Sequence, residues 1–382
     1  MLITNADIYT PAVIIQGGVL RIEGERIVSV EPAESRITGE PIIDGRGLLL
    51  IPGLIDMQCN GFGGHDVRDG AREAIANLAG VLARFGCTAV LPTIVSSPPD
   101  VLRACLAAIA EAVSSRPPGA SILGAHQEGP WLNPRYHGAH LEANIRPFEA
   151  AEWEEIQSAS RGTVRMVTLA PEVPGNEGAV GAIVAAGAIA SLGHSGADYA
   201  QAAAAAVIGA RMATHLFNAM VPFLHRAPGL PGAALDHEDL IPGIIPDGHH
   251  IHPAAIRLAV HAKGLHGVVV VTDSVSVAGC PPGEYTMLGQ PVTWDGETVR
   301  RRDGGLAGSG LSPIEALRRY IRFAGLSLHE ALPAMTSTPA RLLGLQDERG
   351  SIAPGARADV VLLTPDHHVH TTIVGGQVVY RA

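Results

Sequence analysis

Residues 53–94 have the sequence GLIDMQCNGFGGHDVRDGAREAIANLAGVLARFGCTAVLPTI. In this segment the apolar runs Gly53–Cys59 and Thr88–Ile94 flank the alanine-rich run Ala71–Phe85. Short apolar runs are typical of buried strands, and a longer run with apolar residues at helical spacing is typical of a helix. The segment is therefore predicted to form a strand–helix–strand unit of a parallel sheet.

The same alternation continues along the chain and favours a (β/α)8 barrel. The predicted strands are Gly53–Cys59, Thr88–Ile94, Ile122–His126, Arg165–Leu169, Ile189–Gly193, Arg211–Thr214, Ile241–Ile245 and Val268–Thr272. Two further helices are predicted between them, at Asp100–Ser114 and Ala197–Ile208. A doubly wound open sheet is the alternative, but its first turn would carry a Gly-x-Gly-x-x-Gly motif that this sequence lacks.

Both ends of the chain have a different pattern, with short apolar runs separated by Gly and Pro turns. Strands are predicted at Leu2–Asn5, Val13–Gln16, Val19–Ile22, Ile27–Val30, Gly350–Ile352, Asp359–Leu363, Val369–Val374 and Gln377–Tyr380. Before the last four, helices are predicted at Ser312–Gly325 and Leu328–Leu343. We expect residues 1–50 and 345–382 to build one small β-sandwich domain beside a barrel of residues 51–344.

Composition excludes several classes of function. The chain has 382 residues, 47% of them hydrophobic, and a net charge of −10, which argues against a disordered chain and against a nucleic-acid-binding surface. Lys263 is the only lysine, so the chain has no phosphate-binding loop of the Gly-Lys-Ser/Thr type. The 17 histidines favour metal or acid–base chemistry instead.

The cysteines and the N-terminus bear on location. Cys59, Cys87, Cys105 and Cys280 are scattered and form no Cys-x-x-Cys pair, which is typical of a reducing compartment. No signal peptide and no apolar run long enough to span a membrane is visible. We expect a cytoplasmic protein with no membrane partner.

Polar side chains follow six of the eight predicted strands, and in a barrel the carboxyl ends of all strands meet at one rim. These residues are Gln58 and Asn60, Glu128, His194, His215, Asp247 to His250, and Asp273. A carboxylate and two imidazoles with an open fourth position are typical of a catalytic metal site. We therefore expect Glu128, His194 and His215 to bind one divalent metal per subunit, zinc by preference, with iron or cobalt as alternatives.

Asp273 and Arg226 complete the candidate site. A carboxylate beside a metal-activated water is suited to act as a general base, although an Asp before Ser at a strand–helix junction is also a common helix cap. Arg226 lies in the long loop after the sixth strand, where its guanidinium could bind a carboxylate or phosphate or form a surface ion pair.

Several motifs resemble a known family. The opening Ile51-Pro-Gly-Leu-Ile-Asp-Met-Gln-Cys-Asn-Gly61 and the tail Ser337-Thr-Pro-Ala-Arg-Leu-Leu-Gly344 resemble the amidohydrolase superfamily. Four others resemble the N-acetylglucosamine-6-phosphate deacetylases, and they are His126-Gln-Glu-Gly-Pro-Trp-Leu-Asn133, Gly193-His-Ser195, Thr214-His-Leu-Phe-Asn-Ala-Met220 and Leu306-Ala-Gly-Ser-Gly310. The resemblance extends over nearly the whole chain.

The resemblance implies hydrolysis of the acetamide of a phosphorylated amino sugar, with Asp273 as the acid–base residue. It implies that His140 contacts the sugar and the acetamide, and that Ala307 lines the acetyl pocket. It also implies that the phosphate is held by His250, by the backbone at Asn218 and Ala219, and by Arg226 from the neighbouring subunit of a homodimer.

One departure from the superfamily concerns the first strand. Many superfamily members have His-x-His there, which binds a second metal, whereas this chain has Gln58 and Asn60. Amides are poor zinc ligands compared with imidazole. We therefore expect a single metal, with Gln58 and Asn60 on the substrate side of the site.

Other functions stay open at this point. A deacetylase for the galactosamine epimer would carry the same motifs. A dihydroorotase, a deaminase or an N-acyl amino acid deacylase would use a similar barrel and metal. A non-catalytic scaffold would have lost a ligand or the base, but all four of these residues are present.

Overall fold

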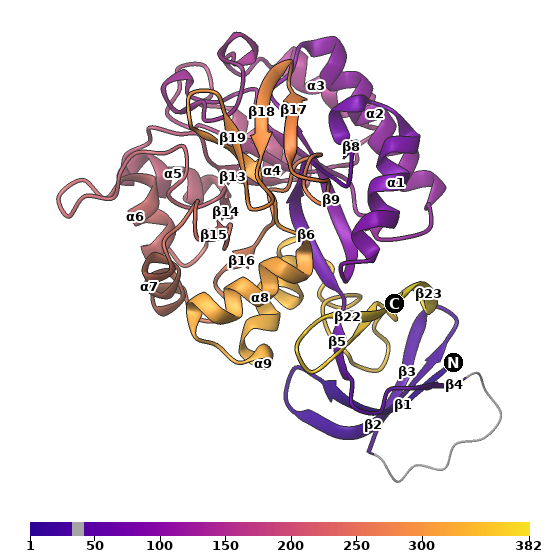
Figure 1. Ribbon diagram of the computed structural model, residues 1–382. Coiled ribbons are helices and arrows are strands. Elements are labelled where there is room, and N and C mark those ends of the chain that lie inside the picture. The colour runs from indigo at the N-terminus through magenta and orange to yellow at the C-terminus, as the bar shows by residue number, and fades with distance from the viewer. Residues whose placement is uncertain (33–41) are drawn as a thin grey trace.

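The centre of the molecule is a ring of parallel strands (Figure 1). The computed structural model describes residues 1–32 and 42–382. The strands of the ring are β6 (Leu54–Cys59), β9 (Cys87–Val95), β11 (Ala125–Glu128), β12 (Val164–Leu169), β13 (Ile189–Leu192), β14 (Met212–Ala213), β15 (Ile241–Ile244) and β16 (Val269–Val270), and a short β10 (Ser121–Ile122) also pairs with β9. Each predicted barrel strand corresponds to one of them.

Hydrogen bonds between β6 and the segment after β16 close the ring. The backbone N–H of Asp273 donates to the Gln58 carbonyl at 2.8 Å, and that of Asn60 donates to the Ser274 carbonyl at 2.8 Å. The buried Asp56 carboxylate accepts the Thr272 hydroxyl at 2.6 Å across the same seam. The predicted (β/α)8 barrel is thus confirmed, and the open-sheet alternative is wrong.

Helices surround the ring and cover its outer face (Figure 1). They are α1 (Arg72–Ala83), α2 (Pro99–Ser115), α3 (Ala150–Ser160), α4 (Ala179–Ala185), α5 (Tyr199–Ile208), α6 (Gly229–Asp236), α7 (Pro253–Lys263), α8 (Pro313–Ala324), α9 (Leu328–Ala331) and α10 (Ser337–Leu342). The predicted helix Leu328–Leu343 is interrupted by a 3₁₀ turn, Leu332–Met335, because Pro333 cannot continue an α-helix. Across residues 1–32 and 42–382, every helix is too short or too polar to cross a bilayer.

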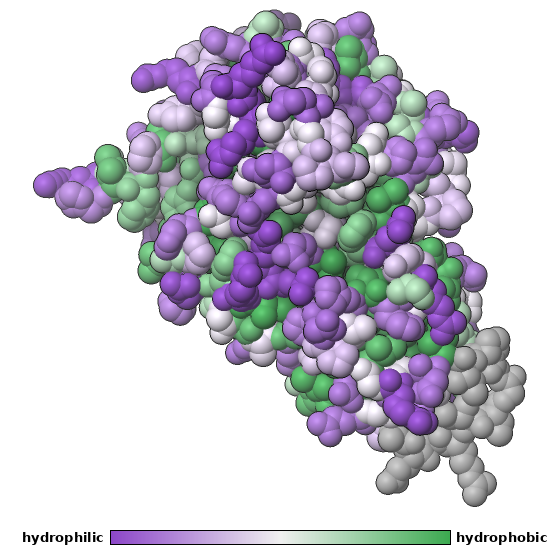
Figure 2. Space-filling view, viewed as in Figure 1, coloured by the Kyte–Doolittle hydropathy of each residue, from purple (hydrophilic) through white to green (hydrophobic). Residues whose placement is uncertain are grey.

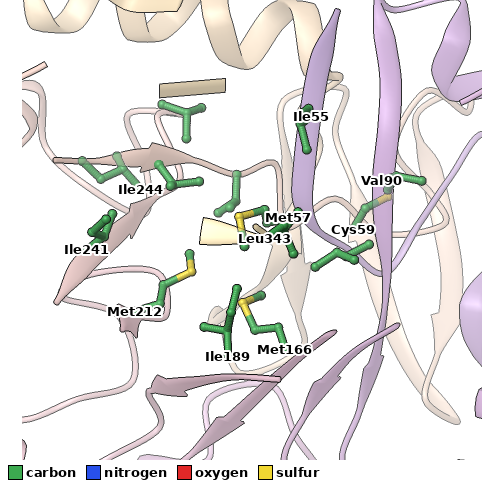
Figure 3. Packing of buried hydrophobic residues seen from close by; sticks show 14 of the residues in the cluster. Ile55, Met57, Cys59, Val90, Met166, Ile189, Met212, Ile241, Ile244 and Leu343 are labelled. Carbon is green, nitrogen blue, oxygen red and sulfur yellow. The ribbon is translucent and has the colours of Figure 1, made fainter. Parts of the chain in front are cut away.

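One continuous cluster of buried apolar side chains joins the barrel strands to the helices. Figure 3 shows part of it, with labelled side chains from β6, β9 and β12 to β15. A core of this size needs no metal or disulfide to stabilise the fold. The polar residues at the rim are therefore free for chemistry.

A second sheet contains strands from both ends of the chain (Figure 1, lower right). Its strands are β1 (Leu2–Tyr9), β2 (Ile14–Glu23), β3 (Arg26–Glu31), β4 (Ile42–Asp44), β5 (Leu49–Pro52), β21 (Val360–Leu363), β22 (Val369–Val374) and β23 (Gln377–Arg381). The two ends meet where β5 pairs antiparallel with β21. The two predicted strands Val13–Gln16 and Val19–Ile22 are parts of the single strand β2. Residues 350–352 form an irregular bend, with Gly350 at φ 82°, rather than a strand. The domain boundaries at 50 and 345 stay a prediction.

A four-stranded antiparallel sheet between β16 and α8 had not been predicted. It consists of β17 (Gly283–Met287), β18 (Gln290–Trp294), β19 (Thr298–Arg301) and β20 (Leu306–Ser309). Val292, Trp294 and Val299 form a small core of its own with Val275 from the barrel rim. Asp295-Gly296 and Asp303-Gly304 at its turns are typical hairpin signals that could have revealed it. We call residues 283–309 the rim sheet, because they contribute to the pocket described next.

Candidate active site

Glu128, His194 and His215 converge at the rim of the barrel, as predicted. His194 Nε2 lies 3.3 Å and His215 Nε2 lies 3.1 Å from the same Glu128 oxygen, Oε1. The two Nε2 atoms are 3.1 Å apart, and all three side chains are buried. Across residues 1–32 and 42–382, this is the one cluster of at least three His, Cys, Asp or Glu whose atoms could share a metal ion.

The hydrogen bonds of His194 favour metal binding. Its Nδ1 lies 2.9 Å from the Tyr136 carbonyl, which can only accept, so the ring proton is on Nδ1 and Nε2 carries a lone pair. Burial and the nearby His140 lower the pKa of His194 to about 4, which keeps the ring neutral. Lone pairs and a carboxylate oxygen that converge on one point repel each other unless a cation lies between them, so this donor set fits a divalent metal.

The backbone at this rim adopts an unusual conformation. His194, His215, Ala219 and Asp273 have φ values of 49°, 30°, 49° and 47°, a region that residues with a Cβ rarely adopt. Such strain persists only where the surrounding structure holds it, and it is concentrated at functional sites. Three of these residues, His194, His215 and Asp273, follow barrel strands, and their side chains are candidate site residues.

Asp273 lies beside the cluster and is held by the two amides predicted to face the substrate. Asn60 donates to Asp273 Oδ1 at 2.7 Å, and Gln58 donates to the same oxygen at 3.1 Å. The Gln58 amide also donates to Glu128 Oε1 at 3.1 Å, so it connects the base to the metal cluster. Burial, together with the Glu128 charge, raises the pKa of Asp273 to about 7. A carboxyl group with this pKa can both accept and return a proton near neutral pH.

His140 presents an N–H group to the same space. The backbone N–H of Ser96 donates to His140 Nδ1 at 3.2 Å, so in the neutral ring the proton is on Nε2. That Nε2 lies 3.7 Å from Glu128 Oε2. His194 and His215 approach the other oxygen of the same carboxylate, Oε1. His140 can therefore donate a hydrogen bond to a group bound beside the metal centre.

A cavity of about 250 Å³ opens above these residues. Besides the metal cluster, Asp273, Asn60 and His140, its walls contain the predicted substrate residues Asn218, Ala219, His250 and Ala307. His250 is oriented by Asp247, whose carboxylate lies 2.5 Å from its Nδ1. The structure thus brings the predicted site residues to one place with two exceptions. Gln58, predicted to face the substrate, is fully buried and does not line the cavity, and it reaches the site only through its bonds to Asp273 and Glu128.

The second exception is Arg226, which does not line the cavity either. It lies in the segment 221–228, a loop that projects from the side of the barrel near α6 and carries exposed Phe223 and Leu224 (Figures 1 and 2, left). Within one subunit this arginine points to solvent.

Apart from Ala307 on β20, the sequence analysis did not predict that the rim sheet contributes to the cavity. Met287, Val292 and Arg301 from this sheet line one wall. Arg301 also donates to the Gly138 carbonyl at 2.6 Å, and so connects the rim sheet to the loop that carries His140.

Comparison with known proteins shows the family. The model of the family described as "Amidohydrolase family" matches residues 49–379. The chain belongs to the amidohydrolase family. The superfamily resemblance seen in the motifs is confirmed, and the metal cluster agrees with the metal dependence of this family.

Its relatives are similar over almost their full length. N-acetylglucosamine-6-phosphate deacetylase of Bos taurus is 37% identical and covers 98% of this chain and 95% of its own. N-acetylgalactosamine-6-phosphate deacetylase of Escherichia coli O157:H7 is also 37% identical, with 94% and 93% covered. A mutant N-acetyl-D-glucosamine-6-phosphate deacetylase of Mycobacterium smegmatis, solved in complex with N-acetyl-D-glucosamine-6-phosphate, has a TM-score of 0.93, 30% identity and 99% of each chain covered.

Proposed function

We propose that this amidohydrolase removes the acetyl group of N-acetylglucosamine 6-phosphate, releasing glucosamine 6-phosphate and acetate. The observation that carries the proposal is the pairing of the Glu128–His194–His215 cluster with Asp273 in one cavity. The choice of substrate is supported by the names of the Bos taurus relative and of the solved Mycobacterium smegmatis structure. The cytoplasmic location expected from the four free cysteines belongs to the same proposal.

Glu128, His194 and His215 would hold one divalent ion per subunit, and zinc, iron and cobalt all suit these ligands. When bound, such an ion supplies Lewis-acid polarisation at the reacting carbonyl or water. The Gln58 and Asn60 amide nitrogens donate to the Asp273 carboxylate, a role that a second metal would disturb. We therefore keep the expectation of one metal.

Asp273 moves the proton in the proposed reaction. It takes a proton from the attacking water as the water oxygen bonds to the acetamide carbon, and gives that proton to the sugar nitrogen as the C–N bond breaks. Gln58 and Asn60 hold the Asp273 carboxylate in place for both transfers. His140 Nε2–H is positioned to donate to the substrate and steady it during the attack.

The phosphate would lie in the same cavity, on His250 and the backbone at Asn218 and Ala219. Arg226 would reach it from the neighbouring subunit, which makes a homodimer part of the proposal. The galactosamine epimer is the second candidate substrate, because one relative with equally high identity carries that name.

The first prediction compares four substrates with zinc-loaded protein. We expect fast acetate release from N-acetylglucosamine 6-phosphate and a kcat/KM lower by about 10²-fold or more for unphosphorylated N-acetylglucosamine, because charge-assisted phosphate contacts are lost. The two galactosamine counterparts identify the epimer. Equal rates with and without phosphate would contradict the phosphate site, and inactivity on all four with metal bound would favour a dihydroorotase, a deaminase or an N-acyl amino acid deacylase.

The second prediction concerns Arg226. Arg226→Ala is expected to raise KM far more than it lowers kcat, since the residue anchors the phosphate away from the reacting carbon. At a substrate concentration far below the KM of Arg226→Ala, where each variant alone is nearly inactive, mixing it with Asp273→Asn protein should restore activity. The expected level is about a quarter of wild type after random exchange in a dimer, because each mixed dimer has one complete site. Arg103→Ala, on the exposed ion pair with Glu155, is the matched control. An unchanged KM, or no recovery on mixing, would remove Arg226 from the neighbouring site.

A further inference from the structure

We propose that Glu172, which no motif assigned to the site, is a positioning residue that holds His194 in its metal-binding orientation. The proposal rests on the metal site proposed above and adds a residue to its support. Glu172 lies just beyond β12, and it does not line the cavity. It acts on His194 through two segments that it holds together.

The Glu172 carboxylate accepts three hydrogen bonds. Oε2 accepts the Ser195 hydroxyl at 2.7 Å. Oε1 accepts the backbone N–H of Gly196 and the side-chain amide of Asn133, the latter at 2.9 Å. The first two donors directly follow His194 in the chain, and the third belongs to the loop after β11.

Through Ser195 and Gly196, Glu172 restrains the backbone of His194. That backbone has φ 49°, a conformation that relaxes unless it is held. The backbone N–H of Asn133 donates to the His194 carbonyl at 2.9 Å, so the chain directly after the strained φ is held by a second segment as well. Glu172 bonds to both segments, to Asn133 on one side and to Ser195 and Gly196 on the other.

Through Asn133, Glu172 also restrains the imidazole ring. Asn133 shapes the turn that follows it, because its Oδ1 accepts the Arg135 N–H at 2.9 Å and its carbonyl accepts the Tyr136 N–H at 2.9 Å. The Tyr136 carbonyl is the group that accepts the His194 Nδ1 proton. The same carboxylate therefore controls where the ring lies and which nitrogen faces the metal cluster.

The turn at Tyr136, the ring of His194 and the segment after His194 are packed too closely to move independently. A Cβ on Gly196 would lie 2.8 Å from Tyr136 Cε2 and 3.1 Å from Asn133 Nδ2. A Cβ on Gly138 would lie 3.0 Å from His194 Cε1. Loss of the Glu172 bonds would therefore displace the Tyr136 turn and the His194 ring together.

The test measures metal affinity on demetallated protein. Glu172→Ala is expected to weaken Zn²⁺ binding by about 10- to 100-fold in competition with a chromophoric chelator. It should also change the visible absorption of the Co²⁺ form, which reports ligand geometry. Glu172→Gln is expected to restore nearly wild-type affinity, because its amide oxygen can accept from Gly196 and Asn133 while the Ser195 hydroxyl turns to accept from its NH₂ group. Glu177→Ala, an exposed residue in the same loop, is the matched control.

The outcomes separate the role of Glu172 from the metal site itself. Wild-type Zn²⁺ affinity in Glu172→Ala would overturn the positioning role. The role would also be overturned if Glu172→Gln bound Zn²⁺ as weakly as Glu172→Ala does. If Glu172→Ala does not fold, Asn133→Ala decides, with weakened binding expected and unchanged binding overturning the proposal. His194→Ala in the same titration should lose the site. If it binds zinc as the wild type does, the metal site is wrong and the role of Glu172 falls with it.

Discussion

Replacing Asp273 by asparagine is expected to lower kcat by about 10²–10⁴-fold while the metal stays bound. Asparagine preserves the size of the side chain but cannot take a proton from water. Asp273 is not one of the residues predicted to bind the metal, and the Glu128–His194–His215 cluster is intact without it. The loss should therefore appear in turnover and not in metal content, measured by steady-state kinetics and elemental analysis on the same preparation.

The pH profile gives a second readout of the same variant. Asp273 acts in its ionised form, so kcat/KM is expected to fall as the pH drops through the pKa of this group. Burial raises that pKa to about 7, and a bound cation would move it lower. The acid limb of the wild-type profile should be missing from the residual activity of Asp273→Asn. The exposed Asp69→Asn is the matched control, and near-normal turnover in Asp273→Asn would show that another group is the base.

Removal of the metal, by a chelator or by His215→Ala, is expected to lower turnover by about 10³-fold or more. Lewis-acid polarisation supplies several kcal/mol of transition-state stabilisation, and each 1.36 kcal/mol is tenfold in rate. Because His215 Nε2 lies 3.1 Å from both Glu128 Oε1 and His194 Nε2, alanine removes one of three converging ligand atoms. The variant should therefore bind metal more weakly as well.

Reconstitution distinguishes the two treatments. Chelated wild-type protein should recover when zinc, iron or cobalt is added back, and the order of recovery identifies the preferred ion. His215→Ala should not recover at the same metal concentrations. His261→Ala, an exposed histidine on α7, should behave as wild type throughout. Full activity in demonstrably metal-free protein would rule out the proposed chemistry.

The sequence alone predicted the barrel and the centre of the site, and the physical reason is local. Strands buried on both faces appear as short apolar runs, so all eight could be located from hydrophobicity. Parallel strands in a barrel place their carboxyl ends at one rim. A polar residue at the end of such a run was therefore a candidate for the site without any knowledge of distances, and Glu128, His194, His215 and Asp273 were found in this way.

Only the tertiary structure decided what holds those residues and what covers them. The rim sheet packs on the barrel through a small core shared with Val275, a contact that no local pattern contains. Glu172 reaches Asn133 and Ser195 across 39 and 23 positions of sequence, and these bonds exist only because neighbouring strands bring their following loops together. Arg226 is excluded from its own cavity by the path of its loop, which hydrophobicity does not predict. Local patterns report burial and strand ends, whereas support and enclosure depend on contacts between distant segments.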